Sequence, residues 1–246
     1  MPSQRFAILK AGTAYRETRE RQGDFDRMVM DLLAEPGQVW DVHDVEHGQF
    51  PPDPAVYDGF VLTGSRASAY DKLPWIGALL DLVRASHGRG QILLGICFGH
   101  QVLAQALGGE VRPNPLGWDV GVRELRLMPE AARVPGLAGA PQPLRIYELH
   151  QDVVVHPPAQ AVTLASSSHT ACEIFTLGPR TLGVQGHPEF DTDTLRVALA
   201  KLRGAGLLNE EQTARSEATL AAEPDRPFLR GWLRAFLNHS TRRLSA

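Results

Sequence analysis

The feature that most constrains the fold is a sharp turn between an apolar segment and an amphipathic one. The apolar segment Gln91–Ile96 enters the turn Gly95-Ile-Cys97-Phe-Gly99, and a helical pattern over Gln101–Leu107 follows at once. A turn that presents its central side chain needs a strained backbone there, so the residues two positions away must be nearly free of side chain. Gly95 and Gly99 meet this requirement. The pattern is the thiol counterpart of the strand–Gly-x-Ser-x-Gly–helix turn.

Cys97 is therefore the first candidate nucleophile. The turn places it at a helix N-terminus, where the positive end of the helix dipole favours a thiolate. The backbone N–H of Phe98 would then point toward an oxyanion formed beside the sulfur. The alternative is a packing thiol, because most free cysteines are buried in cores.

The rest of the chain predicts an α/β fold with a largely parallel sheet, because short apolar segments alternate with longer amphipathic ones. The expected strands of the parallel part are 6–10, 39–45, 59–63, 91–96 and 181–185, and the expected helices are 25–33, 75–85 and 101–107. Three further segments, 122–127, 145–148 and 162–167, have strand patterns without long helices between them. We expect these to be antiparallel additions to the sheet.

One domain is expected over residues 1–246, with a catalytic core over about 5–200 and a helical C-terminal extension over about 201–246. The Gly- and Pro-rich stretch 135–143 is interpreted as surface turns, since too little chain follows it to build a second core. From Asp191 onward the pattern is helical.

Composition excludes several classes of protein. The formal net charge of −3 gives no indication of a nucleic-acid partner. The N-terminus lacks the long apolar segment of a signal peptide, and no stretch has the eighteen or so apolar residues of a spanning helix. Two cysteines, Cys97 and Cys172, cannot form a disulfide framework. We expect a cytoplasmic protein with reduced thiols and no membrane contact.

A second motif lies about ninety residues after Cys97, where the apolar segment Leu182–Gln185 ends at Gly186-His187-Pro188-Glu189. A cysteine nucleophile needs a base that holds it as thiolate and later protonates the leaving amine, and the base needs a carboxylate that fixes its tautomer. In an extended segment the i, i+2 spacing puts both side chains on one face, so Glu189 can reach the distal ring nitrogen of His187. Taken alone, this segment is also compatible with a surface turn.

Together, Gly-Ile-Cys-Phe-Gly-His-Gln at 95–101 and Gln-Gly-His-Pro-Glu at 185–189 resemble the class I glutamine amidotransferase family. The resemblance implies a three-layer, flavodoxin-like sandwich with a mostly parallel central sheet and antiparallel additions. It also implies a catalytic triad and an oxyanion hole built from two backbone N–H groups. The triad would be Cys97, His187 and Glu189, and the oxyanion hole would use Phe98 and Gly64, the latter in the strand end Val61-Leu-Thr-Gly64-Ser65.

The resemblance also implies substrate-binding residues. Gln101 matches the family's substrate-holding glutamine, and His150-Gln151-Asp152 matches the strand end whose main chain holds the amino-acid head of the substrate. Trp118 and Asp119, within Gly117–Gly121, resemble the plant-type γ-glutamyl peptidases of the family. The alternative for this segment is a tight turn in which Trp118 is a packing anchor.

Two departures separate the chain from fused amidotransferases such as GMP synthase. Those proteins usually carry a small polar residue just before the strand-end His, where this chain has Leu149. No synthase domain is expected either, since only about sixty residues follow Glu189 in the sequence. Both departures favour a stand-alone hydrolase of γ-glutamyl amides such as glutathione or its conjugates. No metal or cofactor is expected, because the thiolate, imidazole and two backbone N–H groups supply the chemistry.

Two other hypotheses remain open. The chain could be the glutaminase subunit of a two-component amidotransferase, which passes ammonia from glutamine to a synthase partner chain. It could also be a non-catalytic binding module on the same fold, although a broken triad would then be expected. The sequence does not determine the identity of the leaving group or the state of homo-oligomerisation.

Overall fold

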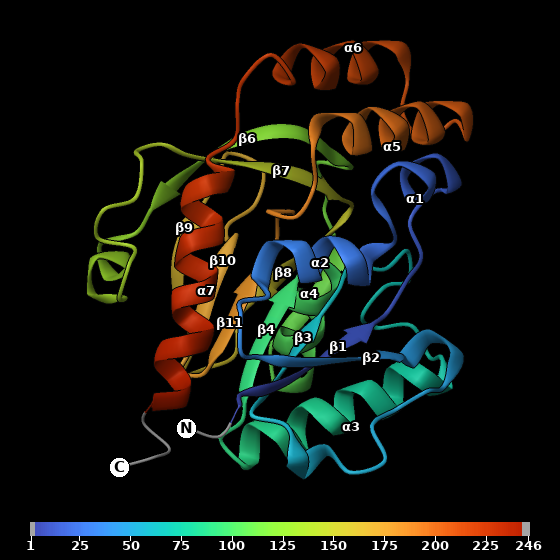
Figure 1. The fold of residues 1–246 in the computed structure, drawn as a ribbon. Helices are drawn as coiled ribbons and strands as arrows, with labels where there is room; N and C mark the ends of the chain where they lie inside the picture. The colour runs from blue at the N-terminus through green and yellow to red at the C-terminus, as the bar shows by residue number, and fades with distance from the viewer. Residues whose placement is uncertain (1–2, 243–246) are drawn as a thin grey trace.

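The central element of the fold is a nine-stranded sheet (Figure 1). The computed structural model describes residues 3–242, with side chains described to residue 238. The strand order is β2-β1-β3-β4-β11-β10-β9-β6-β7, and β5 pairs with β8 in a separate two-stranded sheet. The strands are β1 (Arg5–Lys10), β2 (Val39–Asp44), β3 (Gly59–Leu62), β4 (Ile92–Ile96), β5 (Glu110–Pro113), β6 (Asp119–Leu127), β7 (Leu144–His150), β8 (Asp152–His156), β9 (Val162–Ser166), β10 (Ile174–Leu177) and β11 (Thr181–Val184).

Parallel pairing joins β2, β1, β3, β4 and β11. Neighbouring parallel strands need a crossover connection, and helices supply most of these here. The residues of β3, β4 and β11 are all buried, as expected for parallel strands covered on both faces. The helices are α1 (Arg16–Gln22), α2 (Phe25–Leu33), α3 (Pro74–Gly88), α4 (Phe98–Ala106), α5 (Thr192–Gly204), α6 (Glu210–Thr219) and α7 (Arg226–Arg242).

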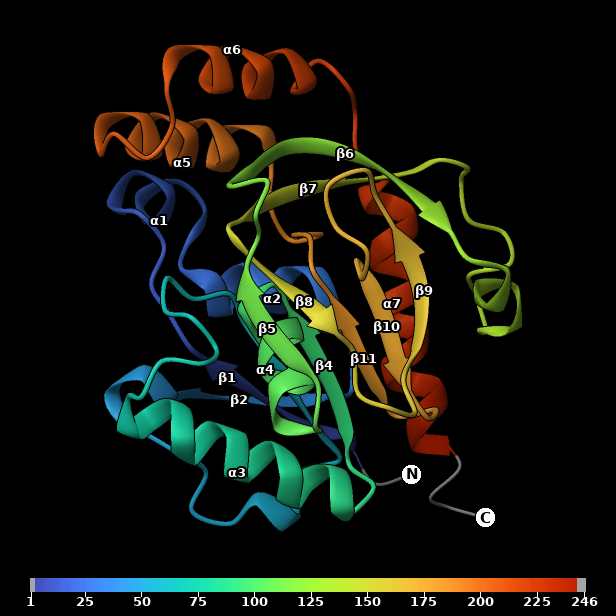
Figure 2. The ribbon, with the colours of Figure 1, turned by 180° about the vertical axis from the view of Figure 1, so that it is seen from behind.

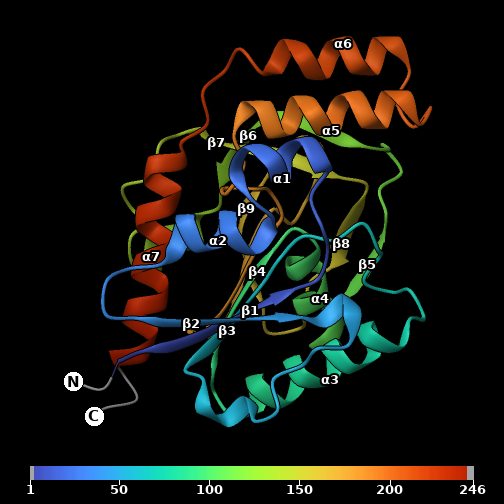
Figure 3. The same cartoon turned by 45° about the vertical axis from the view of Figure 1, so that its right-hand side comes forward.

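Alternate residues of the parallel strands form two cores. On one face, Ile8, Val61 and Leu94 pack with side chains from α2 and α7. On the other face, Leu9 and Leu62 pack with α3 and α4. Figure 3 shows α2 beside α7, and the two helices are in contact. The result is the three-layer α/β sandwich that the sequence predicts.

The second half of the sheet is antiparallel: β11 pairs with β10, β10 with β9, β9 with β6, and β6 with β7. The antiparallel additions expected from the strand patterns without intervening helices are confirmed. Seen from behind, β5 and β8 lie over α4, which both strands contact (Figure 2). The strand end of β7 at His150 is thereby brought close to the carboxyl end of the parallel half.

Most elements fall where the patterns place them, and the differences have physical reasons. The helix α2 has the expected bounds, while β6 begins at Asp119 and β7 ends at His150, both further than predicted. The helix α1 was not expected, because its sequence Arg-Glu-Thr-Arg-Glu-Arg-Gln has no apolar face and only Thr18 is buried.

The C-terminal residues complete the fold in two places. Helices α5 and α6 stack over β6 and β7, beside α1 (Figure 1). The helix α7 runs along the sheet and buries Leu229, Trp232, Leu233 and Leu237 in the core that contains β4 and β11. The ends of the predicted domain, residues 1–2 and 243–246, lie outside the described residues.

Within residues 3–242, no helix combines the length and the apolar character that crossing a membrane requires.

The packing of α7 gives a stability prediction. Leu233 is fully buried, so Leu233→Ala should lower the free energy of unfolding by about 2–5 kcal/mol through lost burial and a residual cavity. Gly231 is exposed in the same helix and has open space at its Cβ position. Gly231→Ala should therefore raise the free energy of unfolding by up to about 1 kcal/mol. Denaturant titration of both variants measures the difference. Equal small effects would mean that α7 does not contribute to the core.

Candidate active site

Cys97 lies between β4 and α4 in a strained backbone conformation. Its φ of 53° and ψ of −105° make it the one non-glycine residue with positive φ among the described residues. Its N–H donates to the carbonyl of Val184 on β11 at 2.9 Å, and its own carbonyl accepts from Gln101 N at 3.1 Å, inside α4. The cysteine is therefore held by the sheet on one side and by the helix on the other, as strain of this kind requires.

Steric crowding explains why glycine occupies the two positions that flank the turn. A Cβ at Gly95 would lie 2.4 Å from the carbonyl carbon of Gly99, and one at Gly99 would lie 2.5 Å from the carbonyl oxygen of Leu62 on β3. Both contacts are with backbone, which cannot move aside as a flexible side chain does. The glycines thus let α4 begin directly against the strands.

His187 and Glu189 follow β11 and form a buried pair. The Nδ1 atom of His187 lies 2.8 Å from Oε1 of Glu189, and the two side chains are 3% and 2% exposed. Because a carboxylate only accepts, Nδ1 carries the proton in this contact. Among the described residues, no oxygen or nitrogen atom hydrogen-bonds Nε2. The imidazole stacks on Phe190 with ring centroids 3.9 Å apart.

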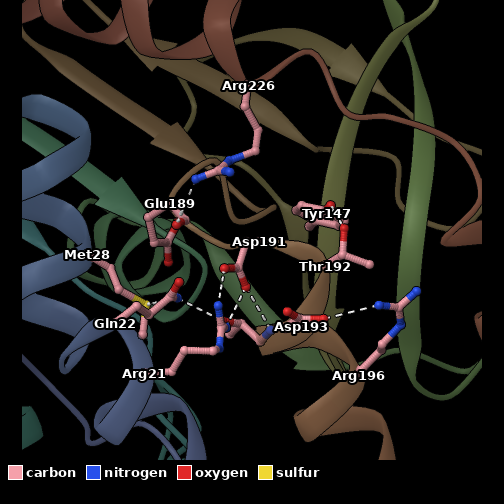
Figure 4. A network of polar contacts seen from close by, with 11 residues as sticks. Arg21, Gln22, Met28, Tyr147, Glu189, Asp191, Thr192, Asp193, Arg196 and Arg226 are labelled. Atoms are coloured by element: carbon pink, nitrogen blue, oxygen red, sulfur yellow. Dashed lines mark hydrogen bonds and ion pairs between the residues drawn. The ribbon is translucent and has the colours of Figure 1, made fainter.

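Contacts with α7, α1 and α5 hold the segment 188–191 in place (Figure 4). Arg226 of α7 donates to the carbonyl oxygens of Pro188 and Glu189 at 3.4 Å each. Arg21 of α1 forms an ion pair with Asp191, which also caps α5. Burial would raise the pKa of Asp191, but hydrogen bonds from Arg21 and Thr194 outweigh it and lower that pKa to about 2. The carboxylate is thus ionised at neutral pH and the segment is anchored on both sides.

Electrostatics favour the imidazolium form of His187. Burial alone lowers the pKa of His187, but negative charge on Cys97 and on Glu189 outweighs burial and raises that pKa well above its usual value. The other cysteine differs: Cys172 is 2% exposed, and burial raises its pKa to about 12. Cys172 therefore stays a neutral packing thiol at physiological pH, as its sequence context indicates.

A cavity of about 360 Å³ opens beside these groups. The polar part of its lining comes mainly from the loop after β3 and the β7–β8 junction. The apolar part of its lining includes Phe25, Phe190, Ala198, Leu202 and Leu207. Cys97 and His187 both line the cavity. A volume of this size is in the range of pockets that enclose small organic ligands.

Gly64 lies in the cavity wall next to both reactive groups. A Cβ built on Gly64 would be 3.3 Å from Cε1 of His187 and 4.0 Å from Cβ of Cys97. Phe98 is the first residue of α4, so its N–H has no intrahelical carbonyl to bond. The two N–H groups predicted to form an oxyanion hole thus come from segments that flank the sulfur.

Six of the predicted substrate and oxyanion residues line the cavity: Gly64, Gln101, Trp118, His150, Gln151 and Asp152. The amide Nε2 of Gln101 donates to the carbonyl of Asp152 at 2.9 Å, which ties α4 to the β7–β8 junction. Asp119 does not line the cavity. Its carboxylate is fully buried and pairs with Arg123 at 2.5 Å, so it serves the interior of the sheet rather than the cavity wall.

Other cavity residues could not be found from sequence motifs. Asp152 accepts hydrogen bonds from the hydroxyls of Ser68, at 2.5 Å, and Tyr70, at 3.0 Å. Both donors come from the irregular loop after β3, where neither periodicity nor spacing singles out a residue. Tyr15 and Arg66 line the mouth, with the guanidinium 4.4 Å from the Tyr15 ring centroid.

The arrangement of thiol, imidazole and carboxylate is that of cysteine-nucleophile acyl-transfer enzymes. The family model for "Glutamine amidotransferase class-I" matches residues 28–202. The chain belongs to the class I glutamine amidotransferase family and is an enzyme of the hydrolase or amidotransferase kind. The resemblance drawn from the two motifs is confirmed.

Two curated relatives match different shares of the chain. Gamma-glutamyl peptidase 5 of Arabidopsis thaliana is 33% identical over 227 residues, which cover 90% of each chain. A GMP synthase [glutamine-hydrolyzing] of Aeropyrum pernix is 38% identical over 100 residues, which cover 41% of this chain and 19% of that protein.

The fold has a counterpart among solved structures. A glutamine amidotransferase from Thermotoga maritima superimposes with a TM-score of 0.75 at 22% identity, covering 97% of this chain and 98% of that one. The predicted fold class, a mostly parallel sheet with antiparallel additions, is confirmed by this likeness.

The turn at Cys97 gives a second prediction. Gly95→Ala should lower the free energy of unfolding by about 1–3 kcal/mol or more and remove most activity, because the new methyl group meets the backbone of Gly99. Gly77→Ala is the control, since Gly77 is an exposed residue of α3 with open space at its Cβ position. It should keep full activity. Thermal unfolding and a turnover assay compare the two, and an active Gly95→Ala protein would contradict this explanation of the turn.

Proposed function

We propose that this protein is a cysteine hydrolase of γ-glutamyl amide bonds and that it acts through a γ-glutamyl thioester on Cys97. The observation that carries the proposal is the juxtaposition of Cys97 with His187, whose imidazole is oriented by the buried Glu189, at the wall of one cavity. No metal or cofactor enters the proposed mechanism, because these three side chains supply the nucleophile, the proton transfer and its orientation.

In the first half-reaction, the Cys97 thiolate attacks the γ-carbonyl carbon of the substrate. The backbone N–H groups of Phe98 and Gly64 bind the oxyanion that forms. His187 then donates its Nε2 proton to the amide nitrogen, the C–N bond breaks, and an amine or ammonia leaves. A γ-glutamyl thioester remains on Cys97, and Glu189 keeps the neutral imidazole in the correct tautomer.

In the second half-reaction, water attacks the thioester. Neutral His187 takes a proton from the water as it attacks, and the tetrahedral intermediate collapses with loss of the Cys97 thiolate. Glutamate leaves, and the thiolate–imidazolium pair is restored. The raised pKa of His187 supports this cycle, because the imidazole holds a proton at the start of each turnover.

The polar part of the cavity lining is the proposed site for the α-amino acid head of the γ-glutamyl group. Gln101, Gln151 and Asp152 belong to this part, and the carbonyl of Leu149 lies 3.7 Å from the sulfur of Cys97. His150 contributes through its main chain in this proposal, since its imidazole is only 2% exposed. Trp118 would pack against the aliphatic part of the substrate.

The apolar part of the cavity lining is the proposed site of the leaving group. A site that releases only ammonia would need little space, whereas the cavity lined by Cys97 also extends to α5 and to Leu207. The plant relative at 33% identity is named a gamma-glutamyl peptidase, and its match covers 90% of this chain. Both observations support γ-glutamyl peptides, such as glutathione or its conjugates, as substrates.

The second candidate function is that of a glutaminase that feeds ammonia to a synthase chain. The match to a GMP synthase over 100 residues supports it. The chemistry at Cys97 and His187 would be the same, and only the leaving group and the need for a partner would differ.

Substitutions of the imidazole and carboxylate test the mechanism. His187→Ala should lower the rate on the order of a thousandfold or more, because the proton donor to the leaving amine is lost. Glu189→Gln should lower it less, because the imidazole remains while its orientation and charge support are weakened. Steady-state kinetics on folded variants measure both. Near-wild-type rates in both variants would place the proton donor elsewhere.

The substrate is tested by product analysis on the isolated protein. At equal substrate concentration, release of Cys-Gly from glutathione should be faster than release of ammonia from glutamine. Cys97→Ala is the control and should release neither product. A preference for glutamine that rises sharply when a second protein is added would contradict the peptidase assignment and support the glutaminase candidate.

A further inference from the structure

Behind the reactive groups, three titratable side chains meet in the interior of the molecule. Glu148 on β7 and Glu173, just before β10, are fully buried, and His150 at the end of β7 is 4% exposed. One ligand-type atom from each lies within 4.8 Å of the other two. The mechanism above does not use the carboxylates of this cluster, although burying two of them together is costly unless their charge is compensated.

The hydrogen-bond roles of His150 show that its ring offers no donor to the carboxylate of Glu148. The Nδ1 atom of His150 lies 3.1 Å from the carbonyl oxygen of Asp152, and a carbonyl only accepts, so Nδ1 carries a proton. The other nitrogen, Nε2, lies 3.2 Å from Oε2 of Glu148. Within the described residues neither carboxylate oxygen of Glu148 accepts a conventional hydrogen bond. A proton between Glu148 and its neighbours is needed to satisfy these contacts.

The surrounding charges also require one proton. Glu148 faces Asp119 and Arg123 from β6, Glu173, His150 and His187. Asp119 and Arg123 form an ion pair with each other, so they do not neutralise the two glutamates. With one shared proton, Glu148, Glu173 and a singly protonated His150 carry a net charge of −1.

The direction of the pKa shift of each of the three groups agrees with one shared proton in the cluster. Burial raises the pKa of Glu148 well above its usual value, and the Asp119 carboxylate adds to the effect. Burial and the Glu148 charge raise the pKa of Glu173 in the same direction. Burial lowers the pKa of His150, so the ring is neutral and the carboxyl groups hold the proton.

Glu148 also touches the segment that carries His187. A Cβ built on Gly186 would lie 2.5 Å from Oε1 of Glu148, so only a glycine fits between this carboxylate and the segment. The N–H of His187 donates to the carbonyl of Tyr147, the residue before Glu148, at 2.7 Å. The charge on His187 acts on Glu148 and also on His150. Glu148 is therefore the carboxylate of the cluster that lies against the segment carrying the catalytic imidazole.

We propose that Glu148 is a positioning residue for His187: it shares one buried proton with Glu173 and His150, and the negative charge that remains stabilises the imidazolium form of His187. The inference rests on the proposed role of His187 as proton donor to the leaving amine. The shared proton stays in the cluster during turnover, because His187 alone exchanges protons with Cys97, the amine and water.

The test compares Glu148→Gln with Glu173→Gln. Each substitution preserves shape, and its amide replaces the shared proton as a donor to the remaining carboxylate. Both variants keep a charge of −1 in the cluster, but the charge moves to Glu173 in the first and to Glu148 in the second. The double variant has no charge there.

The expected readout is the alkaline limb of the pH profile of kcat/KM, which reports loss of the His187 proton. In Glu148→Gln this limb should move to lower pH by on the order of half a pH unit or more, since the carboxylate that lies against the His187 segment is then neutral. In Glu173→Gln the alkaline limb should stay at the wild-type pH or move to higher pH. In the double variant it should move to the lowest pH of the three. Identical profiles in both single variants would overturn the proposal.

Two measurements without turnover separate this proposal from the proposed function. Infrared difference spectra at neutral pH should show the carbonyl band of a protonated carboxylic acid in the wild type, and each single variant should lose it. Titration of the ¹⁵N-labelled His187 ring should rank the pKa of His187 in the variants in the same order as the alkaline limbs of their pH profiles. These results would stand even if the natural substrate proved not to be a γ-glutamyl amide. An absent band, or one divalent cation per chain by elemental analysis, would show that no shared proton holds the cluster.

Discussion

The parallel pairing of β4 with β11 is the constraint on which the site depends. These strands are about ninety residues apart in sequence, yet their register places Gly95 opposite Gly183 and Ile96 opposite Val184. Both strands therefore end at the same edge of the sheet, one at Cys97 and the other at the segment that leads to His187. The hydrogen bond from Cys97 N to Val184 O closes the pairing at that edge. Each reactive group follows the last paired residue of a buried strand, so little freedom remains in their relative position.

The strain at Cys97 is supported by packing on both sides of this pair. Gly95 and Gly99 allow α4 to begin against the strands, while α2 and α7 cover the opposite face. The segment after β11 is fixed separately, by Arg226 from α7 and Arg21 from α1 (Figure 4). Helices from both ends of the chain thus contribute to holding the imidazole, which explains why the site is built from residues dispersed over most of the sequence.

The sequence predicts the parts of this arrangement that local chemistry determines. The Gly-x-Cys-x-Gly turn and the His-Pro-Glu segment were found because strain and i, i+2 spacing leave a mark within a few residues. Strands β3, β4 and β11 of the parallel half were found because burial on both faces favours continuous apolar segments. Five of the eight predicted strands lie in that half, with bounds that differ from the structure by one residue or so.

The remaining features depend on contacts between distant segments. Ser68 and Tyr70 bond Asp152 from an irregular loop, and no pattern in that loop selects them. Asp119 was expected at the cavity, but the partner that holds it inside the sheet, Arg123, is apparent only once β6 is folded. Glu148 and Glu173 have a weak signal, since each is a charged residue with apolar neighbours on both sides in the sequence. Their proximity to each other is apparent only in the folded structure, because β7 and β10 are not neighbours in the sheet.

The central claim is that Cys97 becomes acylated by the γ-glutamyl group of the substrate, and a trapped intermediate tests it most directly. The protein is mixed with a γ-glutamyl peptide, quenched with acid within the first turnovers and analysed by intact-protein and peptide mass spectrometry. The account predicts one γ-glutamyl adduct per chain, located on the peptide that contains Cys97 and absent from the Cys97→Ala protein. An adduct on the buried Cys172, or product formation in the Cys97→Ala protein at the wild-type rate, would contradict it.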